Sequence, residues 1–315
     1  MKTKATASKN SLLALCIGIN NYPGTGSDLS GCVNDANDWA KELNSRGYNV
    51  EKLLDKNANG ANIRKGINAT IAKAKRGDTV IITYSGHGTY VPDLNGDEPD
   101  GLDEAICPHD TNTKGVITDD ELFLMFNARG TGVHLAFLSD SCHSGTVSRF
   151  APITTPATTT SANAPQRTVR FLPPSVFMKP AALKKMGIGS AYRASKAPGR
   201  YAGLLLSGCQ DHEYSYDAWF NGRPNGAFTF VALKTLKTLP AGSTILHGTK
   251  LTALRFPHAS MLRPRTFMAI LPVSDGKCLP KHLSDQYEVS YSVWLSQVNG
   301  QNEWRDLLNV LSGSG

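Results

Sequence analysis

The alternation of short apolar runs with helix-period segments is the feature that most constrains the fold of this chain. Residues 12–19, 79–84 and 134–139 are short apolar runs, typical of strands that are buried on both faces of a sheet. Apolar residues recur every three or four positions over 29–43 and 63–74, which predicts two amphipathic helices. Strands that alternate with helices indicate an α/β sandwich with a mostly parallel central sheet.

Weaker patterns extend this scheme along the chain. An acidic loop follows the run at 79–84, and a helix is expected to start at Thr118, because Thr118 and Glu121 have the spacing of a capping box. We also expect strands over 48–54, 202–207 and 287–294, and a helix over 227–239.

The net charge of +7 comes from one segment of the chain. Residues 141–210 hold nine basic residues and no acidic one, whereas residues 1–140 are net negative. Clustered basic residues can bind nucleic acid, but this segment lacks the closely interleaved aromatic residues of a single-strand platform. Residues 147–200 are rich in Thr, Ala, Pro and Ser without a sustained period, which predicts a flexible insertion.

Composition excludes several other classes of protein. A chain of 315 residues that is 40% hydrophobic can bury the core of one large domain or two small ones. No apolar run approaches the roughly 20 residues of a membrane helix, and six scattered cysteines without a CxxC pair argue against a zinc ribbon or a disulfide scaffold. Lysines before residues 12–19 and a lipoprotein-like box at 29–32 permit a secretory interpretation. A buried strand explains the eight-residue run better, so we expect a cytoplasmic protein.

Two of the apolar runs end in residues that can carry out nucleophilic chemistry. Ser85-Gly86-His87-Gly88 follows one run, and Asp140-Ser141-Cys142-His143-Ser144-Gly145 follows another. The carboxyl ends of neighbouring parallel strands meet at one rim of a sheet, so a histidine and a cysteine there can act as base and nucleophile. The N–H groups of Gly88 and Cys142 can stabilise an oxyanion. On the residues alone, a buried cysteine and an exposed histidine explain the pattern equally well.

These two motifs, together with Asp28-Leu29-Ser30-Gly31-Cys32-Val33-Asn34-Asp35-Ala36, resemble the bacterial metacaspases, a branch of the caspase-like cysteine peptidases. Weaker similarity continues through 204–211 and 225–228, which look like the small-subunit part. The resemblance implies a caspase-like three-layer α/β/α sandwich with a mostly parallel central sheet. It implies a tail at 1–10, a peptidase domain at 11–275 and an extension of unknown role at 276–315. Within the domain, the large-subunit part is 11–146, the basic insertion 147–200 and the small-subunit part 201–275.

The resemblance further implies a cysteine endopeptidase that acts through a dyad and requires no cofactor. Its nucleophile would be Cys142 and its base His87, with His143 as a competing base beside the nucleophile. The chain would be a monomer that acts on proteins or peptides with basic residues, without a membrane partner. The alternatives are a catalytically idle caspase-like scaffold and, less favoured, a basic nucleic-acid-binding protein.

A pocket for the substrate's side chain is also implied by the resemblance. It would be lined by Asp35 and Asp140, with Cys32 and Ser85 nearby and Asp28 adding charge. Two carboxylates in a partly desolvated pocket favour a guanidinium or an ammonium, so we expect cleavage after Arg or Lys. The simpler alternatives are an exposed helix position for Asp35 and a loop-binding acceptor for Asp140.

The acidic loop is a second candidate site, for calcium. Residues 93–104 match an EF-hand only in part, because Glu98 stands at the glycine position. The resemblance implies instead an activating calcium site at Asp103, Asp119 and Asp120. The family's further acidic ligand would lie at 148–150, where this chain has Ser, Arg and Phe. Acidic residues also suit the first turn of a helix, so both interpretations stay open.

The basic insertion lies where caspase-like enzymes are commonly cut between their two parts. We expect one of its side chains to occupy the acidic pocket in the resting enzyme. On activation the chain would be cleaved there, in cis or by an upstream protease. The candidates are Arg149, Arg167, Arg170, Lys179, Lys184, Lys185 and Arg193.

Overall fold

A five-stranded parallel sheet forms the centre of the molecule, with strand order β2-β1-β3-β7-β9. The computed structural model describes residues 10–96, 101–142, 168–179, 204–207 and 215–238, and the pairs 267–268 and 294–295. All five strands lie where the sequence predicts them: β1 (Leu12–Gly18), β2 (Asn49–Leu54), β3 (Thr79–Ser85), β7 (His134–Asp140) and β9 (Leu204–Ser207).

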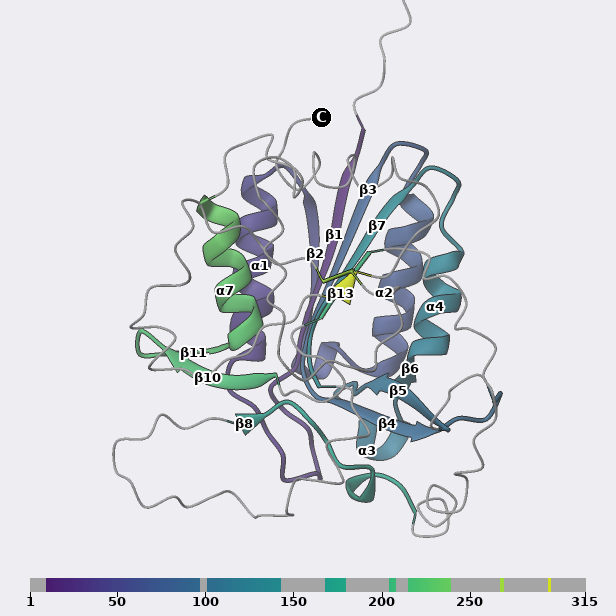
Figure 1. Ribbon diagram of the computed structural model, residues 1–315, viewed down its shortest axis with the longest axis vertical. Helices are drawn as coiled ribbons and strands as arrows, with labels where there is room; N and C mark the ends of the chain where they lie inside the picture. Colours follow the sequence, from purple (N-terminus) through teal and green to yellow (C-terminus); the bar gives the residue numbers. More distant parts are fainter. Residues whose placement is uncertain are drawn as a thin grey trace, which may run out of the picture.

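Helices cover both faces of this sheet (Figure 1). One face carries α1 (Cys32–Ser45) and α7 (Ala227–Thr238), and the other carries α2 (Gly60–Lys73) and α4 (Asp119–Asn127). The predicted three-layer α/β/α sandwich is therefore confirmed. The helix expected from residue 29 begins at Cys32, and Thr118 caps α4 by accepting a hydrogen bond from the Glu121 N–H (3.3 Å).

The core divides into two layers because successive side chains of a strand point to opposite faces. Leu15 and Ile17 of β1 join the cluster under α2 and α4, whereas Ala14 and Cys16 join the cluster under α1 and α7. Strands β1, β3 and β7 each supply both layers, which explains why these segments read as continuous apolar runs. No helix in the described part of the chain is both long and apolar enough to span a bilayer.

Two small antiparallel sheets lie beyond the carboxyl ends of the central strands, and the sequence did not predict them (Figure 1). One forms from the expected acidic loop and comprises β4 (Gly88–Pro92), β5 (Leu102–Ile106) and β6 (Ile117–Thr118). The other comprises β8 (Thr168–Val169), β10 (Tyr216–Phe220) and β11 (Arg223–Gly226). The remaining elements are η1 (Asp55–Asn57), α3 (Thr111–Lys114), η2 (Pro174–Val176) and the paired β12 (Phe267–Met268) and β13 (Trp294–Leu295).

The expectation of a flexible insertion over 147–200 is wrong for residues 168–179. This stretch contains β8 and η2, and the side chains of Arg170 and Leu172 are fully buried. Its partners lie far away in the sequence, so composition could not reveal them. The rest of the insertion, and the strand expected at 287–294 except Trp294, lie outside the described residues.

Candidate active site

His87 and Cys142 extend from adjacent strands at the same rim of the sheet. Strands β3 and β7 pair in parallel with Ser85 opposite Asp140, and each candidate lies two residues beyond its strand's paired position. Both side chains are buried, at 1% exposure for His87 and 0% for Cys142. The register thus brings together the two residues that the sequence analysis named as base and nucleophile.

The imidazole of His87 is held in one tautomer. Its Nε2 lies 2.6 Å from the Ser27 carbonyl oxygen, and a carbonyl only accepts, so Nε2 carries the hydrogen. Nδ1 is buried with no hydrogen-bond partner among the described residues, and its lone pair is available for a proton. Burial lowers the pKa of His87 to about 4, which keeps the ring neutral at pH 7. Tyr22 packs on the ring at 4.7 Å between centroids and accepts the His87 N–H at 2.8 Å.

The thiol of Cys142 contacts the main chain of Ser215, the residue before β10. The Ser215 N–H donates to Sγ at 2.7 Å, and Sγ lies 3.3 Å from the Ser215 carbonyl oxygen. The sequence analysis did not name Ser215, because 73 residues separate it from the nucleophile.

A guanidinium from the chain itself fills a buried cage of three carboxylates. Nη2 of Arg170 lies 2.7 Å from Asp35 and 2.9 Å from Asp217, and Nη1 lies 3.1 Å from Asp140. All four side chains are at most 5% exposed, so water screens these charges little. Burial lowers the pKa of Arg170, but the surrounding carboxylates, Asp140 first, raise it well above its ordinary value. The cage therefore holds a charged guanidinium.

The main chain of Arg170 lies between the candidate catalytic residues. Its carbonyl oxygen accepts from the N–H of Gly88 at 2.9 Å and from the N–H of Cys142 at 3.2 Å. These are the two donors that the sequence analysis assigned to an oxyanion. The Arg170 N–H donates to the Ser215 carbonyl (3.0 Å), which also faces the thiol.

The chain before Arg170 continues this arrangement as a short strand. Thr168 and Val169 form β8 and pair antiparallel with Asp217 and Tyr216 of β10 (Figure 1). Residues 168–170 therefore lie extended along β10, which is how a peptide docks by adding a strand to a sheet edge.

The carboxylates of the cage are held by further hydrogen bonds. Asp35 accepts from the Gly226 N–H (2.9 Å) and from the Asn225 amide (2.9 Å). Burial raises the pKa of Asp35 above its ordinary value; Arg170 lowers it, and the neighbouring Asp140 carboxylate raises it further. Asp140 accepts from the Thr229 N–H at 2.9 Å.

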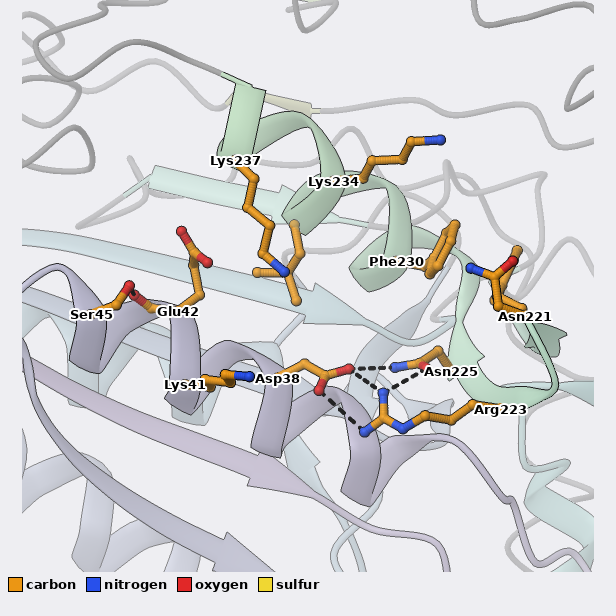
Figure 2. A pocket seen from close by; sticks show the side chains of 12 residues that line it. Asp38, Lys41, Glu42, Ser45, Asn221, Arg223, Asn225, Phe230, Lys234 and Lys237 are labelled. Atoms are coloured by element: carbon orange, nitrogen blue, oxygen red, sulfur yellow. Dashed lines mark hydrogen bonds and ion pairs between the residues drawn. The ribbon is translucent and has the colours of Figure 1, made fainter.

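A pocket of about 590 Å³ between α1 and α7 adjoins the cage (Figure 2). Asn225 links the two, because its amide also donates to Asp38 at 3.0 Å. Asp38 is paired with Arg223, so an outer ion pair orients the amide that holds Asp35 (Figure 2). Lys41, Lys234 and Lys237 are among the other residues that line the pocket.

The third carboxylate of the cage is Asp217, which the sequence analysis missed. Asp217 also accepts from the N–H groups of Ser30 (2.6 Å) and Gly31 (2.9 Å). The suggested third acid, Asp28, is exposed and accepts from the Tyr22 N–H at 2.7 Å. One sequence signal could have pointed to Asp217: Asp211, Glu213 and Asp217 are the first acidic residues after the acid-free segment 141–210, and they follow soon after the strand at 204–207.

The remaining candidates of the pocket and the insertion are placed as follows. Cys32 and Ser85 are buried near the rim, and burial raises the pKa of the Cys32 thiol well above its ordinary value. Lys179 is exposed. The other candidates lie outside the described residues, namely His143, Arg149, Arg167, Lys184, Lys185 and Arg193.

The suggested calcium ligands lie on two neighbouring elements. Asp103 belongs to β5, and Asp119 and Asp120 begin α4. Within the described residues, no three or more His, Cys, Asp or Glu side chains are grouped so as to hold a metal ion. Calcium activation stays a prediction from the sequence.

Comparison with known proteins gives consistent results. Residues 13–150 match the family model "Metacaspase, peptidase C14 domain". Metacaspase-1B of Aspergillus oryzae is 32% identical over 262 residues, which are 72% of this chain and 60% of that protein. Metacaspase-1 of Cryptococcus neoformans is 33% identical over 277 residues, 74% of this chain and 57% of that protein. The chain thus spans about 60% of the length of these curated relatives.

A solved structure gives the same result at the level of the fold. The crystal structure of a Geobacter sulfurreducens protein superposes with a TM-score of 0.54 at 33% identity. The match covers 72% of this chain and 82% of that one.

Proposed function

Because this chain belongs to the metacaspase family of caspase-like cysteine peptidases, we propose that it is an endopeptidase that cuts proteins after arginine and, more slowly, after lysine. The proposal depends most on the way Arg170 is bound. Its guanidinium is caged by three carboxylates while its carbonyl oxygen accepts from the N–H groups of Gly88 and Cys142. This is the arrangement that a substrate's arginine would need immediately before attack at its carbonyl carbon.

The residues support a two-step hydrolysis. Nδ1 of His87 takes the proton of the Cys142 thiol, and the sulfur attacks the carbonyl carbon. The negative charge that develops on the carbonyl oxygen is stabilised by the two N–H donors. His87 then protonates the leaving amine, the C–N bond breaks, and water hydrolyses the thioester to release the new carboxylate.

The cage explains why arginine should be preferred to lysine. Nη1 contacts Asp140, and Nη2 contacts both Asp35 and Asp217. A lysine has one ammonium on a stem without this fork, so it cannot contact both sides of the cage with separate nitrogens. An aspartate side chain would be repelled by the three carboxylates.

The direct test uses reporter peptides that end in Arg, Lys or Asp, with and without added calcium. We expect hydrolysis in the order Arg, then Lys, with none after Asp, and none by the Cys142→Ala variant. Absence of hydrolysis under every condition would contradict the peptidase proposal, and would favour the idle scaffold. A preference for Asp would contradict the role of the cage. The arms with and without calcium decide whether the metal activates the enzyme.

The same contacts support self-cleavage of the Arg170–Phe171 bond. Arg170 is fully buried, so an upstream protease could not reach this bond in the folded resting enzyme, whereas Cys142 contacts its main chain already. We expect mass spectrometry of the incubated protein to find a fragment that begins at Phe171. The Cys142→Ala variant should stay intact. Cleavage only at sites outside 168–179 in an active sample would refute this assignment.

A further inference from the structure

We infer that strand β4 forms a recognition platform for the two residues that follow the cut, and that it selects an aromatic residue followed by a leucine-like residue. This inference rests on the proposed function, because it takes residues 170–172 as the enzyme's own bound substrate. It goes beyond that function, which concerns only the residue before the cut.

Phe171 would be the first residue after the cut, and it lies on an aromatic side chain. Its ring stacks on Tyr90 of β4 with centroids 5.7 Å apart and planes at 22°. Tyr90 is only 8% exposed with Phe171 in place. A small residue at this position would leave the face of Tyr90 without its stacking partner.

Leu172 would be the second residue after the cut, and it is completely buried. It is 0% exposed and belongs to the core cluster under α2 and α4. Its side chain thus occupies an apolar site, where burial of a leucine is strongly favoured.

The backbone contacts fix the register in which these two side chains are presented. The Leu172 N–H donates to the Gly88 carbonyl at 2.9 Å, and the Thr89 hydroxyl donates to the Leu172 carbonyl at 2.7 Å. Gly88 also forms a parallel bridge with Phe171. Gly88 therefore serves both sides of the bond, since its N–H holds the Arg170 carbonyl and its C=O holds Leu172.

These contacts describe a peptide that crosses from one sheet edge to another. Before the cut it pairs with β10, and after the cut it runs along β4. Main-chain hydrogen bonds give such a peptide its register, and the side-chain sites give specificity. Protein substrates with Arg-aromatic-Leu sequences in an exposed, extended stretch are the class that fits.

The test compares two quenched-fluorescent peptides on the activated full chain. They share Thr-Val-Arg before the cut and continue with Phe-Leu or with Gly-Ser. We expect kcat/KM to be at least ten-fold higher for the Phe-Leu peptide, because stacking alone accounts for roughly two- to ten-fold and burial of leucine adds to it. Hydrolysis of both peptides at equal kcat/KM would overturn this inference while leaving the proposed function intact. Hydrolysis of neither would overturn the proposed function.

Enzyme variants locate the effect on β4. Tyr90→Ala should lower the ratio of kcat/KM between the Phe-Leu and Gly-Ser peptides by roughly two- to ten-fold and leave the part that is due to leucine. Tyr90→Phe, which keeps the ring, should retain the full ratio. The exposed Leu124→Ala on α4 is the matched control, and its ratio between the two peptides should equal that of the unmodified enzyme. A ratio that Tyr90→Ala leaves unchanged would overturn the role of Tyr90.

A second readout uses the chain's own bond and needs no added peptide. Rates of cutting at 170–171 are compared for Tyr90→Ala, Phe171→Ala and the double variant. Each single change should slow the cut by roughly two- to ten-fold, and the double variant should be little slower than either, because both remove one contact. If the two single changes slowed the cut by factors that multiply in the double variant, the two rings would not act together. That result would count against the inference.

Discussion

His87 combines burial with a fixed tautomer, and both properties bear on how the proposed dyad would work. The ring donates from Nε2 to the Ser27 carbonyl, and Nδ1, which has no hydrogen-bond partner among the described residues, is the atom that takes the thiol's proton in the proposed mechanism. Sequence could indicate that His87 and Cys142 lie at the same rim of the sheet, because both follow strands of one parallel sheet. The sequence could not reveal that the Ser27 carbonyl is the hydrogen-bond partner of the ring, because Ser27 lies in a loop 60 residues away.

The lowered pKa of His87 predicts a pH-dependent stability. A base whose pKa falls from 6.5 to about 4 on folding binds its proton more weakly in the folded state, so stability is lost as pH falls below 6.5. Between pH 7 and pH 5 this loss amounts to about 2 kcal/mol. Urea unfolding of the Cys142→Ala chain, which stays intact, should therefore lose about 2 kcal/mol more over this range than Cys142→Ala/His87→Gln. Equal losses in the two proteins would contradict the buried, neutral histidine.

The cage predicts that Asp217, and not Asp28, is the third carboxylate that binds the arginine of a substrate. Asp217→Asn removes a buried partner of the guanidinium, and breaking a buried ion pair costs about 3–5 kcal/mol. We expect KM for Arg reporters to rise by at least about ten-fold. Asp28→Asn, an exposed position outside the cage, should change KM by less than about two-fold. The reverse ranking in steady-state kinetics would restore the role that the resemblance gave to Asp28.

At the scale of elements, the strands that sequence predicts well are those buried on both faces. β1, β3 and β7 read as unbroken apolar runs, and all three were placed to within about two residues. β4 and β5 were missed because charged and polar residues such as Asp103 and Glu104 interrupt their apolar pattern. β8 is two residues long and depends on pairing with β10, some 47 positions further on, so no local signal marks it.

The hairpin of β10 and β11 places Gly226 against the cage. A side chain at this position is expected to block the binding of arginine selectively, without affecting Cys142. A Cβ at Gly226 would overlap Asp140 and the Arg170 guanidinium. Gly226→Ala should abolish cutting after Arg, both in the chain and in reporters, while Cys142 stays reactive toward a small alkylating agent in the refolded protein. Gly130→Ala is the matched control, because its added methyl would meet nothing closer than 3.8 Å. Full activity in Gly226→Ala, measured with the same reporters, would show that the guanidinium lies elsewhere.

At the scale of the whole molecule, the two parts of the chain on either side of the proposed cut share one sheet and one core. β9 lies after Arg170 in the chain and pairs in parallel with β7, which lies before it. Helix α7, which also lies after Arg170, packs on α1, which lies before it. Phe228 and Leu233 of α7 join the core cluster that contains Trp39 of α1. The sequence predicted this sandwich as a whole and a basic side chain of the insertion in the acidic pocket, but it could not single out Arg170 among the seven candidates.

Cleavage at 170–171 should therefore leave the fragments associated. We expect the cut protein to elute at the volume of the uncut chain in size-exclusion chromatography, and to separate only in denaturant. The Cys142→Ala chain provides the uncut reference. Two separate peaks under native conditions would contradict the shared sheet.

If the chain cuts itself after Arg170, as proposed, the burial of this residue in its own cage also determines the kinetic order of that cut. A bond held beside its own nucleophile is present at a fixed local concentration, whatever the amount of protein in solution. Dilution should leave the half-time of the first cut unchanged, and an inhibitor arriving from outside would have to displace a seated segment first. Each molecule would then cut its own chain at a rate that does not depend on the other molecules, and it would do so only once.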